Sequence, residues 1–356
     1  MPNSMNIGSL DIGFHNLKGG KTTAVSVEQL RERLVAPNDS DIELELFLLP
    51  AGACPVRELP HSLGNQIGGE TVLINGEKWQ GGIDFGLTPN INKDYSDAYK
   101  HTNEWKALLY TGLKRLGMDR IDCLVLGLPC EEFYKSPVAV KDVIELSVGK
   151  HKIDEDLTVE VKKVIVIPQP LGSFHGYYLA EPDENIRKIL KKAITVVADP
   201  GYGTFDWVVI NKGEHVLQQS AGSTRQSVRA VCLETERLIL AENPNLKLAP
   251  NDIEQCIITD DWEVLVNTKL VDVKPFFEKA ADNIGKSAFK YLRTALSSSS
   301  IDPQICILTA GGAEIFKSIA LKESGADRLL VSDYSIYLNV FGYLYEALKR
   351  KEIGEW

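Results

Sequence analysis

Two short segments of this chain combine an aspartate, glycines and polar residues in a pattern that suits phosphate and metal binding. The first starts at Asp11 and continues through Gly13 to Asn16 and Lys18. Gly13 lets the backbone approach a polyphosphate closely, and Asn16 and Lys18, two residues apart on an outgoing strand, would present donors on one face. Asp11 would repel a phosphate unless a cation lies between them. The segment therefore predicts Mg²⁺, which a carboxylate can hold through the water shell of the ion.

The second segment repeats this pattern in the other half of the chain. Asp199 is the counterpart of Asp11, and Gly201, Gly203 and Thr204 follow it. The hydroxyl of Thr204 and the neighbouring backbone amides are neutral donors for terminal phosphates. Two such loops that face each other would clamp one phosphate tail and one metal ion. The pair is therefore far more specific than either segment alone.

A third segment places two adjacent glycines, Gly311 and Gly312, after an apolar strand and before an expected helix. Glycine at this point allows a flat ligand or a phosphate to lie against the backbone, and a helix N-terminus adds positive potential. Alone, a glycine pair before a helix is typical of a structural turn.

Residues 18–23 also resemble the end of a phosphate-binding P-loop, GxxxxGK[ST]. The first glycine of that motif would fall at His15, and no buried strand ends directly before the loop. We therefore predict that Gly19 and Gly20 form a hairpin turn and that Lys21 is exposed.

Apolar patterning predicts alternating strands and helices around these segments, which is typical of an α/β protein with mixed sheets. The run between residues 193 and 211 predicts two β-branched strands joined by a glycine turn. Residues 34–92 are rich in Pro, Gly and Asn and predict a small peripheral subdomain with loops. The other predicted elements are strands at 123–128 and 304–309, a hairpin from 143–150 to 157–167, and helices at 104–116, 223–241 (N-cap Ser223 or Thr224), 275–296, 336–349 and directly after Gly312.

Length and composition limit the functional classes. A chain of 356 residues with 44% hydrophobic residues predicts two lobes, each with its own core. The net charge of −10 opposes binding to nucleic-acid backbones, so we expect no direct DNA binding. The N-terminus has no secretory pattern and no apolar run is long enough for a membrane span, so we expect a cytoplasmic protein without membrane contact. The six scattered cysteines predict buried free thiols: Cys54, Cys123, Cys130, Cys232, Cys256 and Cys306.

The three motifs, in this order, resemble the phosphate 1, phosphate 2 and adenosine motifs of the actin-like ATPases. The form DxGxxNxK at Asp11 resembles the ParM/StbA branch of that superfamily, the plasmid-segregation ATPases. Residues 164–178 (VIVIPQPLGSFHGYY) and 337–348 (YLNVFGYLYEAL) resemble the interdomain connection and the C-terminal helix of that branch. The resemblance spans residues 7–349 and is weakest at 34–92.

The resemblance implies an actin-like fold, which is the duplicated ribonuclease H-like α/β fold with two lobes around a central nucleotide cleft. Lobe I would comprise residues 1–170, with a peripheral subdomain at about 34–92, and lobe II residues 171–333. Residues 334–356 would form a C-terminal helix that packs back on lobe I.

The same resemblance implies a role for each motif residue. Asp11 and Asp199 would hold Mg²⁺ through waters, and Gln169 would orient the attacking water. A glutamine cannot accept the proton of that water at neutral pH, so its role would be orientation; the alternative is that it lies in a proline-rigid linker. The expected nucleotide contacts are Gly13, Asn16 and Lys18 at the phosphates, Gly201, Gly203 and Thr204 at the γ end, and Gly311 and Gly312 beside the nucleoside.

By resemblance, the function is that of an ATPase which binds ATP, or GTP, with Mg²⁺ and polymerises head to tail into filaments for plasmid or DNA segregation. The expected partners are further copies of the chain and a DNA-binding adaptor protein. The alternatives are a sugar or small-acid kinase of the same superfamily, for which no catalytic base is evident, and a non-filamentous ATP-binding scaffold.

Overall fold

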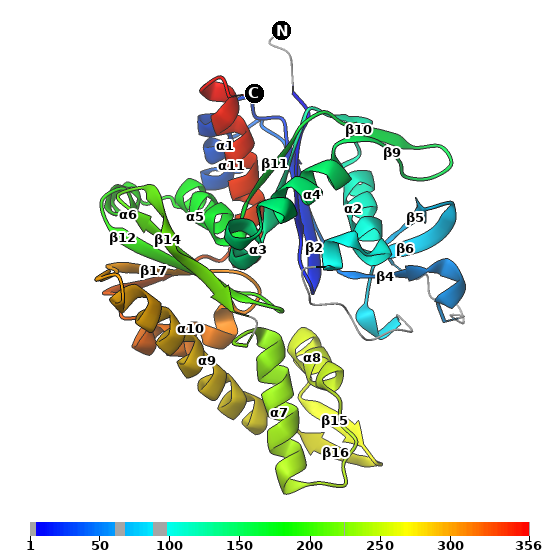
Figure 1. The fold of residues 1–356 in the computed structure, drawn as a ribbon, viewed down its shortest axis with the longest axis vertical. Coiled ribbons are helices and arrows are strands. Elements are labelled where there is room, and N and C mark those ends of the chain that lie inside the picture. The colour runs from blue at the N-terminus through cyan, green and yellow to red at the C-terminus, as the bar shows by residue number, and fades with distance from the viewer. Residues whose placement is uncertain (1–4, 61–67, 88–97, 224, 356) are drawn as a thin grey trace. The chain divides into compact units, whose positions relative to one another are not determined.

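The computed structural model describes residues 5–60, 68–87, 98–223 and 225–355. The chain forms two compact units: Met1–Lys191 together with Ile336–Trp356, and Lys192–Ser335. The boundary lies later than residue 170, where the sequence predicted it. Helix α5 (Gln169–Ala180) stays in the first unit because it packs closely against the C-terminal helix α11 (Leu338–Glu352), as Figure 1 shows.

The first unit contains a five-stranded mixed sheet in the order β11-β8-β1-β2-β3. Strands β1, β2 and β3 form an antiparallel meander, whereas β8 and β11 continue from β1 in parallel. The strands are β1 (Ile7–Ile12), β2 (Asn16–Thr22), β3 (Leu44–Pro50), β8 (Cys123–Leu128) and β11 (Val164–Pro168).

The second unit repeats this topology. Its sheet has the order β14-β13-β12-β17-β18, in which β12, β13 and β14 form the antiparallel meander and β17 and β18 continue in parallel. The duplication suggested by the two aspartate segments is therefore present in both sheets. The strands are β12 (Ile194–Pro200), β13 (Phe205–Asn211), β14 (Glu214–Ser223), β17 (Ile305–Leu308) and β18 (Arg328–Val331).

Two helices pack against the central strands β1 and β2 of the first unit (Figure 1). Helix α2 (Asn103–Leu116) buries Leu108, Leu109 and Leu113, and Thr102 caps its N-terminus by accepting a hydrogen bond from the amide of Trp105. Helix α11 buries Val340, Phe341 and Leu344. The other helices are α1 (Val27–Val35), α3 (Cys130–Lys135), α4 (Pro137–Ser147), α6 (Glu184–Leu190) and the 3₁₀ turns Val56–Glu58, Phe85–Leu87, Tyr99–His101 and Ser335–Tyr337.

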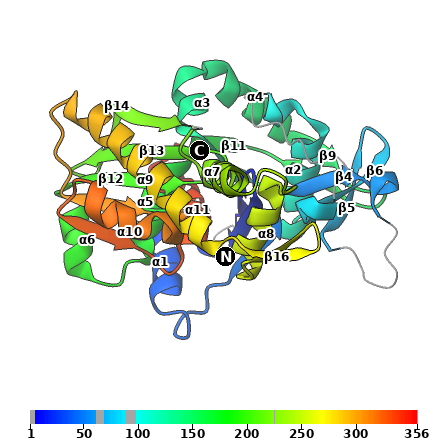
Figure 2. The same ribbon diagram turned by 90° about the horizontal axis from the view of Figure 1, so that it is seen from below.

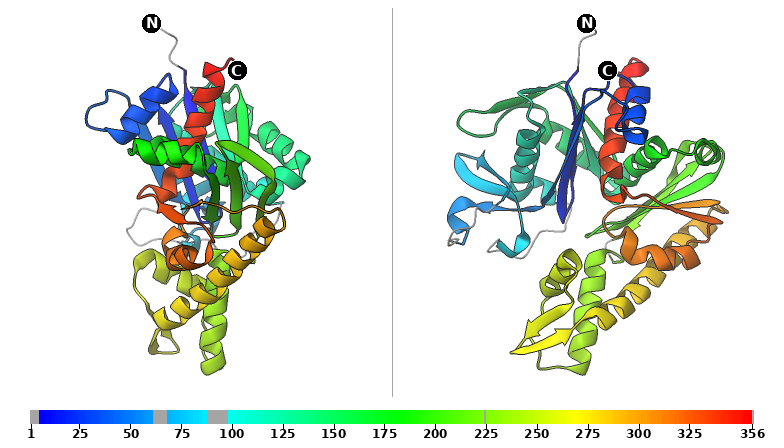
Figure 3. Two further views of the ribbon diagram at one scale, coloured as in Figure 1. Left: turned by 90° about the vertical axis from the view of Figure 1, so that its left-hand side faces the viewer. Right: turned by 180° about the vertical axis from the view of Figure 1, so that it is seen from behind.

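The long helix α9 (Lys274–Ser297) organises the core of the second unit. It contacts α7 (Val228–Glu242) and α10 (Ala313–Glu323), and α9 and α10 lie side by side in Figures 2 and 3. Phe205 of β13 lies among Trp207, Phe289 and Phe316 in this core. The remaining elements are α8 (Pro250–Thr259) and the hairpin of β15 (Glu263–Val266) and β16 (Lys269–Asp272).

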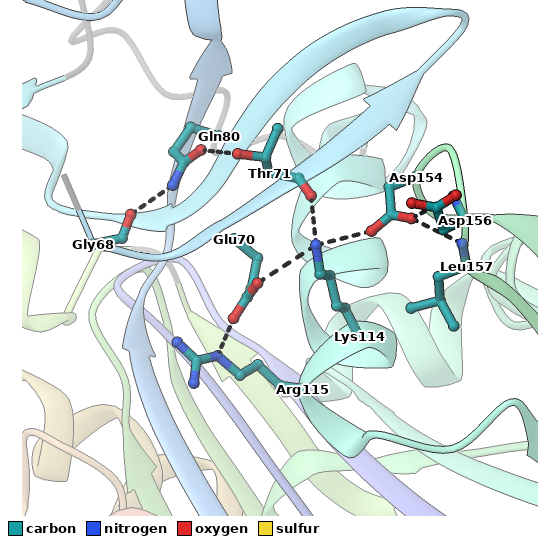
Figure 4. Close-up of polar contacts among 9 residues, drawn as sticks. All are labelled: Gly68, Glu70, Thr71, Gln80, Lys114, Arg115, Asp154, Asp156 and Leu157. Atoms are coloured by element: carbon teal, nitrogen blue, oxygen red, sulfur yellow. Dashed lines mark hydrogen bonds and ion pairs between the residues drawn. The ribbon is translucent and has the colours of Figure 1, made fainter. Parts of the chain in front are cut away.

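A peripheral three-stranded sheet is attached to α2 by charged side chains (Figure 4). Arg115 Nε lies 2.8 Å from Glu70 Oε1, and Lys114 Nζ lies 3.1 Å from the carbonyl oxygen of Thr71. This sheet comprises β4 (Gly52–Pro55), β6 (Glu77–Ile83) and β5 (Glu70–Ile74), and a second small sheet comprises β7 (Arg120–Ile121), β10 (Thr158–Val161) and β9 (Gly149–Lys152). Lys114 Nζ also lies 2.9 Å from Oδ2 of Asp154, which belongs to the loop between β9 and β10. Within the segment 34–92, β3 differs from the predicted peripheral subdomain because it extends the main sheet, while residues 61–67 and 88–92 lie outside the described residues.

Four local predictions are wrong. Residues 143–147 are helical, because Ser136 caps α4 and Ala139, Val143 and Ser147 are buried at helical spacing. Gly19 and Gly20 lie inside β2.

The third wrong prediction concerns α7. This helix begins at Val228 with Ser227 as its cap, because β14 continues to Ser223; the other predicted cap, Thr224, lies outside the described residues. Lys21 is partly buried in an ion pair with Glu45 instead of lying free in solvent.

None of the helices in the described part of the chain is both long enough and apolar enough to cross a membrane.

Candidate functional site

The first hairpin positions a buried charge pair. Asp11 at the end of β1 lies opposite Lys18 of β2 in the antiparallel register. Lys18 Nζ is 2.8 Å from Asp11 Oδ2, and the aspartate is only 1% exposed. A buried carboxylate is costly unless it is paired and hydrogen-bonded, so the partners of Asp11 decide what it can do.

Gln169 is a second partner of Asp11. It is the first residue of α5, directly after β11, and its Nε2 donates to Asp11 Oδ1 over 2.9 Å. A carboxylate only accepts hydrogen bonds, so the amide must point its NH₂ group towards Asp11. The carbonyl oxygen Oε1 is thereby left as an acceptor on a partly exposed side chain. Such an acceptor can orient a water molecule.

The third partner comes from the C-terminal helix. Asn339 Nδ2 donates to Asp11 Oδ2 over 3.2 Å, and Ser173 Oγ of α5 donates to Asn339 Oδ1 over 2.6 Å. Sequence reasoning missed Asn339 and Ser173. A signal was present: Asn339 interrupts the apolar run of 338–341, and a polar residue on a buried helix face requires a partner.

The turn between β1 and β2 carries the remaining residues of the first motif. Gly13 N donates to the carbonyl oxygen of Asn16 over 3.0 Å, which closes the turn. Ala51 N donates to the carbonyl oxygen of His15 over 2.8 Å, and Phe14 packs against Tyr99 with ring centroids 5.2 Å apart. The structure therefore brings Asp11, Gly13, Asn16, Lys18 and Gln169 together in the first unit.

The second unit gathers its predicted residues at the carboxyl ends of two neighbouring parallel strands, β12 and β17. Gly201 N donates to the carbonyl oxygen of Asp199 over 3.0 Å. The carbonyl oxygen of Gly201 accepts from Val228 N over 3.1 Å, which ties the loop to the first turn of α7. Gly203 and Thr204 complete this loop before β13.

The glycine pair after β17 adjoins the same loop. Gly312 N donates to the carbonyl oxygen of Pro200 over 3.1 Å, and a Cβ at residue 312 would overlap that oxygen. Glycine is therefore required at 312 by close backbone approach. A Cβ at Gly311 would meet no atom within 4 Å, so this residue has open space beside it.

The second hairpin differs from the first in one charge. The register places Asp206 opposite Asp199, where the first hairpin has Lys18 opposite Asp11. Both aspartates of the second hairpin are buried. The first unit therefore contributes a cation next to its carboxylate, and the second contributes a further carboxylate.

The donor set suits a hard cation held through water more than a dedicated cage. Within the described ranges, no group of three or more His, Cys, Asp or Glu side chains could hold a metal directly. Carboxylate, amide and hydroxyl oxygens are the ligands that Mg²⁺ accepts together with several waters. The thiols supply no alternative, because burial raises the pKa of Cys123 and of Cys306 to about 12 and keeps both protonated.

Comparisons with known proteins show which fold the two units form. A sequence model described as the N-terminal domain of actin-like proteins matches residues 9–172. Among solved structures, apo ParM of pSK41 is similar over 98% of this chain and 99% of its own, with 20% identity and a TM-score of 0.62. The chain has the actin-like fold.

Two further actin-like structures are similar over almost the full chain. A 15-stranded ParM filament from Clostridium botulinum matches 98% of this chain and 99% of its own at 18% identity, with a TM-score of 0.69. The archaeal actin homologue Ta0583 in complex with ADP matches 97% of this chain and 100% of its own at 16% identity, with a TM-score of 0.66. No curated protein sequence matches the chain. The actin-like fold predicted from the motifs is thereby confirmed.

Proposed function

We propose that this chain is a cytoplasmic actin-like ATPase that binds one Mg-ATP with loops from both units and assembles head to tail into filaments that segregate plasmid or other DNA. The observation that carries the proposal is the Asp11 carboxylate, which is buried and held by a lysine and a glutamine amide at the predicted phosphate loop. The ADP complex of Ta0583 and the ParM filament support the nucleotide and the assembly.

Each unit would contribute a different part of the reaction. In the first unit, Lys18 and the turn around Gly13 and Asn16 would bind phosphate oxygens, and Asp11 would hold a Mg²⁺ ion through its waters. The bound ion would neutralise charge on the phosphates. Gln169 would orient the attacking water through Oε1, since phosphoryl transfer depends mainly on positioning and charge stabilisation.

In the second unit, the loop after β12 would bind the terminal phosphate. Gly201 and Gly203 leave room for backbone amides to approach it, and Thr204 adds a hydroxyl donor. Asp199 would hold the same ion from this side. Gly311 and Gly312 would lie against the nucleoside, where a side chain at 311 would fill the open space.

Polymerisation would follow from a heterologous contact between copies, because a head-to-tail contact that does not close produces a filament. A DNA-binding adaptor protein would connect the filament to its cargo. The chain itself, with a net charge of −10, is poorly suited to direct DNA contact.

Light scattering and phosphate release, recorded together after addition of ATP and Mg²⁺, test the proposal. We expect scattering to rise and then to fall as phosphate is released. Scattering that stays flat, with weak or absent phosphate release, would favour the non-filamentous ATP-binding scaffold. Phosphate release that requires a sugar would indicate a kinase.

The variant Asp199→Ala tests the assignment of the metal site. We expect hydrolysis to be abolished while circular dichroism and urea unfolding still report a folded protein, because the change removes a predicted metal partner at a strand end. The variant Asp260→Ala is a control for the loss of an exposed aspartate of the same unit outside the candidate loops. Wild-type hydrolysis by Asp199→Ala would overturn the assignment.

A further inference from the structure

The C-terminal helix α11 places one polar side chain on the predicted phosphate site. Asn339 is 5% exposed and Ser173 is 1% exposed, so both lie in the interior with Asp11. They form a continuous chain of hydrogen bonds from Ser173 Oγ through both ends of the Asn339 amide to Asp11 Oδ2. Segments from both ends of the chain therefore meet at one carboxylate.

We propose that Asn339, held by Ser173, is a positioning residue for ATP hydrolysis: it fixes the orientation of the Asp11 carboxylate and, through it, that of Gln169. This inference rests on the proposed function. Neither residue contacts the nucleotide in this role, and both act through Asp11.

The hydrogen bonds determine the orientation of each group in turn. The carboxylate of Asp11 only accepts hydrogen bonds, so Nδ2 of Asn339 must face it, and Oδ1 is left to accept from Ser173 Oγ. A flip of the amide would lose the bond to Asp11 and set Oδ1 against the carboxylate. Asp11 Oδ2 then accepts from Asn339 and Lys18, while Oδ1 accepts from Gln169. With donors on both oxygens, rotation of the carboxylate would break all three contacts.

Lys18 alone would not fix the orientation of the Asp11 carboxylate. Its ammonium group is a point charge on a flexible stem with three rotatable donors, and in the proposed reaction it also binds phosphate. A neutral amide on a packed helix keeps its bond to Asp11 when Lys18 turns to another anion. Asn339 thus supplies the contact that is independent of the nucleotide.

Backbone packing holds Asn339 in place. Helices α5 and α11 approach so closely that a Cβ at Gly342 would overlap the carbonyl oxygen of Gly172, and a Cβ at Gly176 would overlap that of Leu338. The backbone on either side of Asn339 therefore cannot shift towards α5. A polar side chain that served only to fill this interior would be costly compared with an apolar one.

The test compares Asn339→Ala and Ser173→Ala with two controls that remove hydrogen bonds elsewhere on the same helices. Tyr177→Phe removes the bond from Tyr177 Oη to Glu181 on α5, and Glu346→Gln weakens the ion pair of Glu346 with Arg350 on α11. For each variant, kcat, KM and the calorimetric Kd for Mg-ATP are measured, together with urea unfolding without nucleotide.

We expect Asn339→Ala to lower kcat about tenfold, the equivalent of one lost buried hydrogen bond to a charged group, with Kd changed by less than about threefold. Ser173→Ala should lower kcat less, and its effect on kcat and on unfolding should vanish in the Asn339→Ala background, because both residues act through one contact. The two controls should keep the wild-type kcat.

Asn339→Asp adds a readout that a packing role would not change. The introduced carboxylate faces Asp11 and is repelled by it, and a proton taken up at low pH turns this repulsion back into a hydrogen bond. The deficit in kcat, relative to wild type, should therefore shrink as the pH falls from about 8 to about 6.

The outcomes separate the two proposals. A wild-type chain that binds no ATP or releases no phosphate would overturn the proposed function and this inference with it. An active wild type whose Asn339→Ala and Ser173→Ala variants keep the wild-type kcat would overturn the inference alone. If Asn339→Ala does not fold, the kcat of Ser173→Ala and the pH profile of Asn339→Asp decide.

Discussion

Lys18 is expected both to stabilise the fold, through its ion pair with Asp11, and to bind phosphate. The side chain of Asp11 is 2% exposed and that of Lys18 is 11% exposed, and the two residues pair across the first hairpin. Replacing Lys18 by Met leaves the Asp11 charge in the interior. We expect a loss of about 3 kcal/mol in the free energy of unfolding, at the lower end of the range for broken buried ion pairs, because two amide donors remain.

Urea unfolding of Lys18→Met and Lys21→Met compares the loss of a buried ion pair with the loss of a partly exposed one on the same strand, β2. Lys21 pairs with Glu45 over 3.2 Å, and the glutamate side chain is 62% exposed, so Lys21→Met should cost less than about 1 kcal/mol. If the two variants lost equal amounts of unfolding free energy, the ion pair of Lys18 with Asp11 would not be a buried contact.

His215 of β14 gives the second unit a pH dependence. Burial lowers the pKa of this histidine from 6.5 to about 4, so the folded chain keeps it neutral while the unfolded chain takes up a proton below 6.5. Its contribution to stability is complete above pH 6.5 and is lost as the pH falls towards 4, with a slope of at most about 1.4 kcal/mol per pH unit. Urea unfolding of wild type and His215→Gln between these pH values should show a smaller loss in the variant, and parallel curves would contradict the shift.

At the scale of elements, the contact between α5 and α11 depends on glycine. Gly342→Ala would press a methyl group into the backbone of Gly172, which cannot rotate away. We expect it to destabilise the first unit by about 1–3 kcal/mol and to lower kcat by displacing Asn339.

Gly285→Ala in α9 is the matched control for Gly342→Ala. Its Cβ would meet side-chain atoms and not backbone: the terminal methyl group of Ile319 at 2.6 Å and a ring carbon of Phe316 at 3.1 Å. Alanine also gains about 1 kcal/mol of helix propensity over glycine. Thermal unfolding should therefore rank Gly342→Ala well below Gly285→Ala, and the reverse order would contradict the tight backbone contact.

The sequence predicted the elements whose patterns are local. The hairpin at 193–211, α2, α9 and the strand before Gly311 lie within a residue or two of their expected positions, since β-branched runs, glycine turns and helical spacing of leucines are read directly from neighbours. The three loops of the candidate site could be predicted for the same reason. Each one follows a strand end.

Predictions from the sequence were wrong where contacts between distant residues determine the local structure. Gly19 and Gly20 were expected to turn, but β3 pairs with them and Phe47 covers Gly19, so they remain in an extended strand. Residues 143–147 have β-branched residues that favour a strand, yet Ser136 and Pro137 start a helix before them. The contact of Asn339 with Asp11 joins residues 328 positions apart, and no local pattern specifies such a pair.

The main sheets of the two units share one topology, and their first hairpins differ in charge. The first hairpin sets Lys18 against Asp11, whereas the second sets Asp206 against Asp199. A duplicated fold with identical loops would have the same electrostatic potential at both hairpins. In the proposed function, one copy would bind phosphate through a cation, whereas the other would use a metal ion and neutral donors.

The proposed function predicts that the two loops act on one ligand. We expect calorimetry to give one Mg-ATP per chain, and Lys18→Met and Thr204→Val each to weaken binding by about 10–100-fold, as expected for a hydrogen bond to a charged group. If each loop bound its own phosphate compound, the titration would show two sites and each variant would remove one of them. With one shared ligand, the stoichiometry stays at one in both variants and only the affinity falls, because the remaining loop still holds the same molecule.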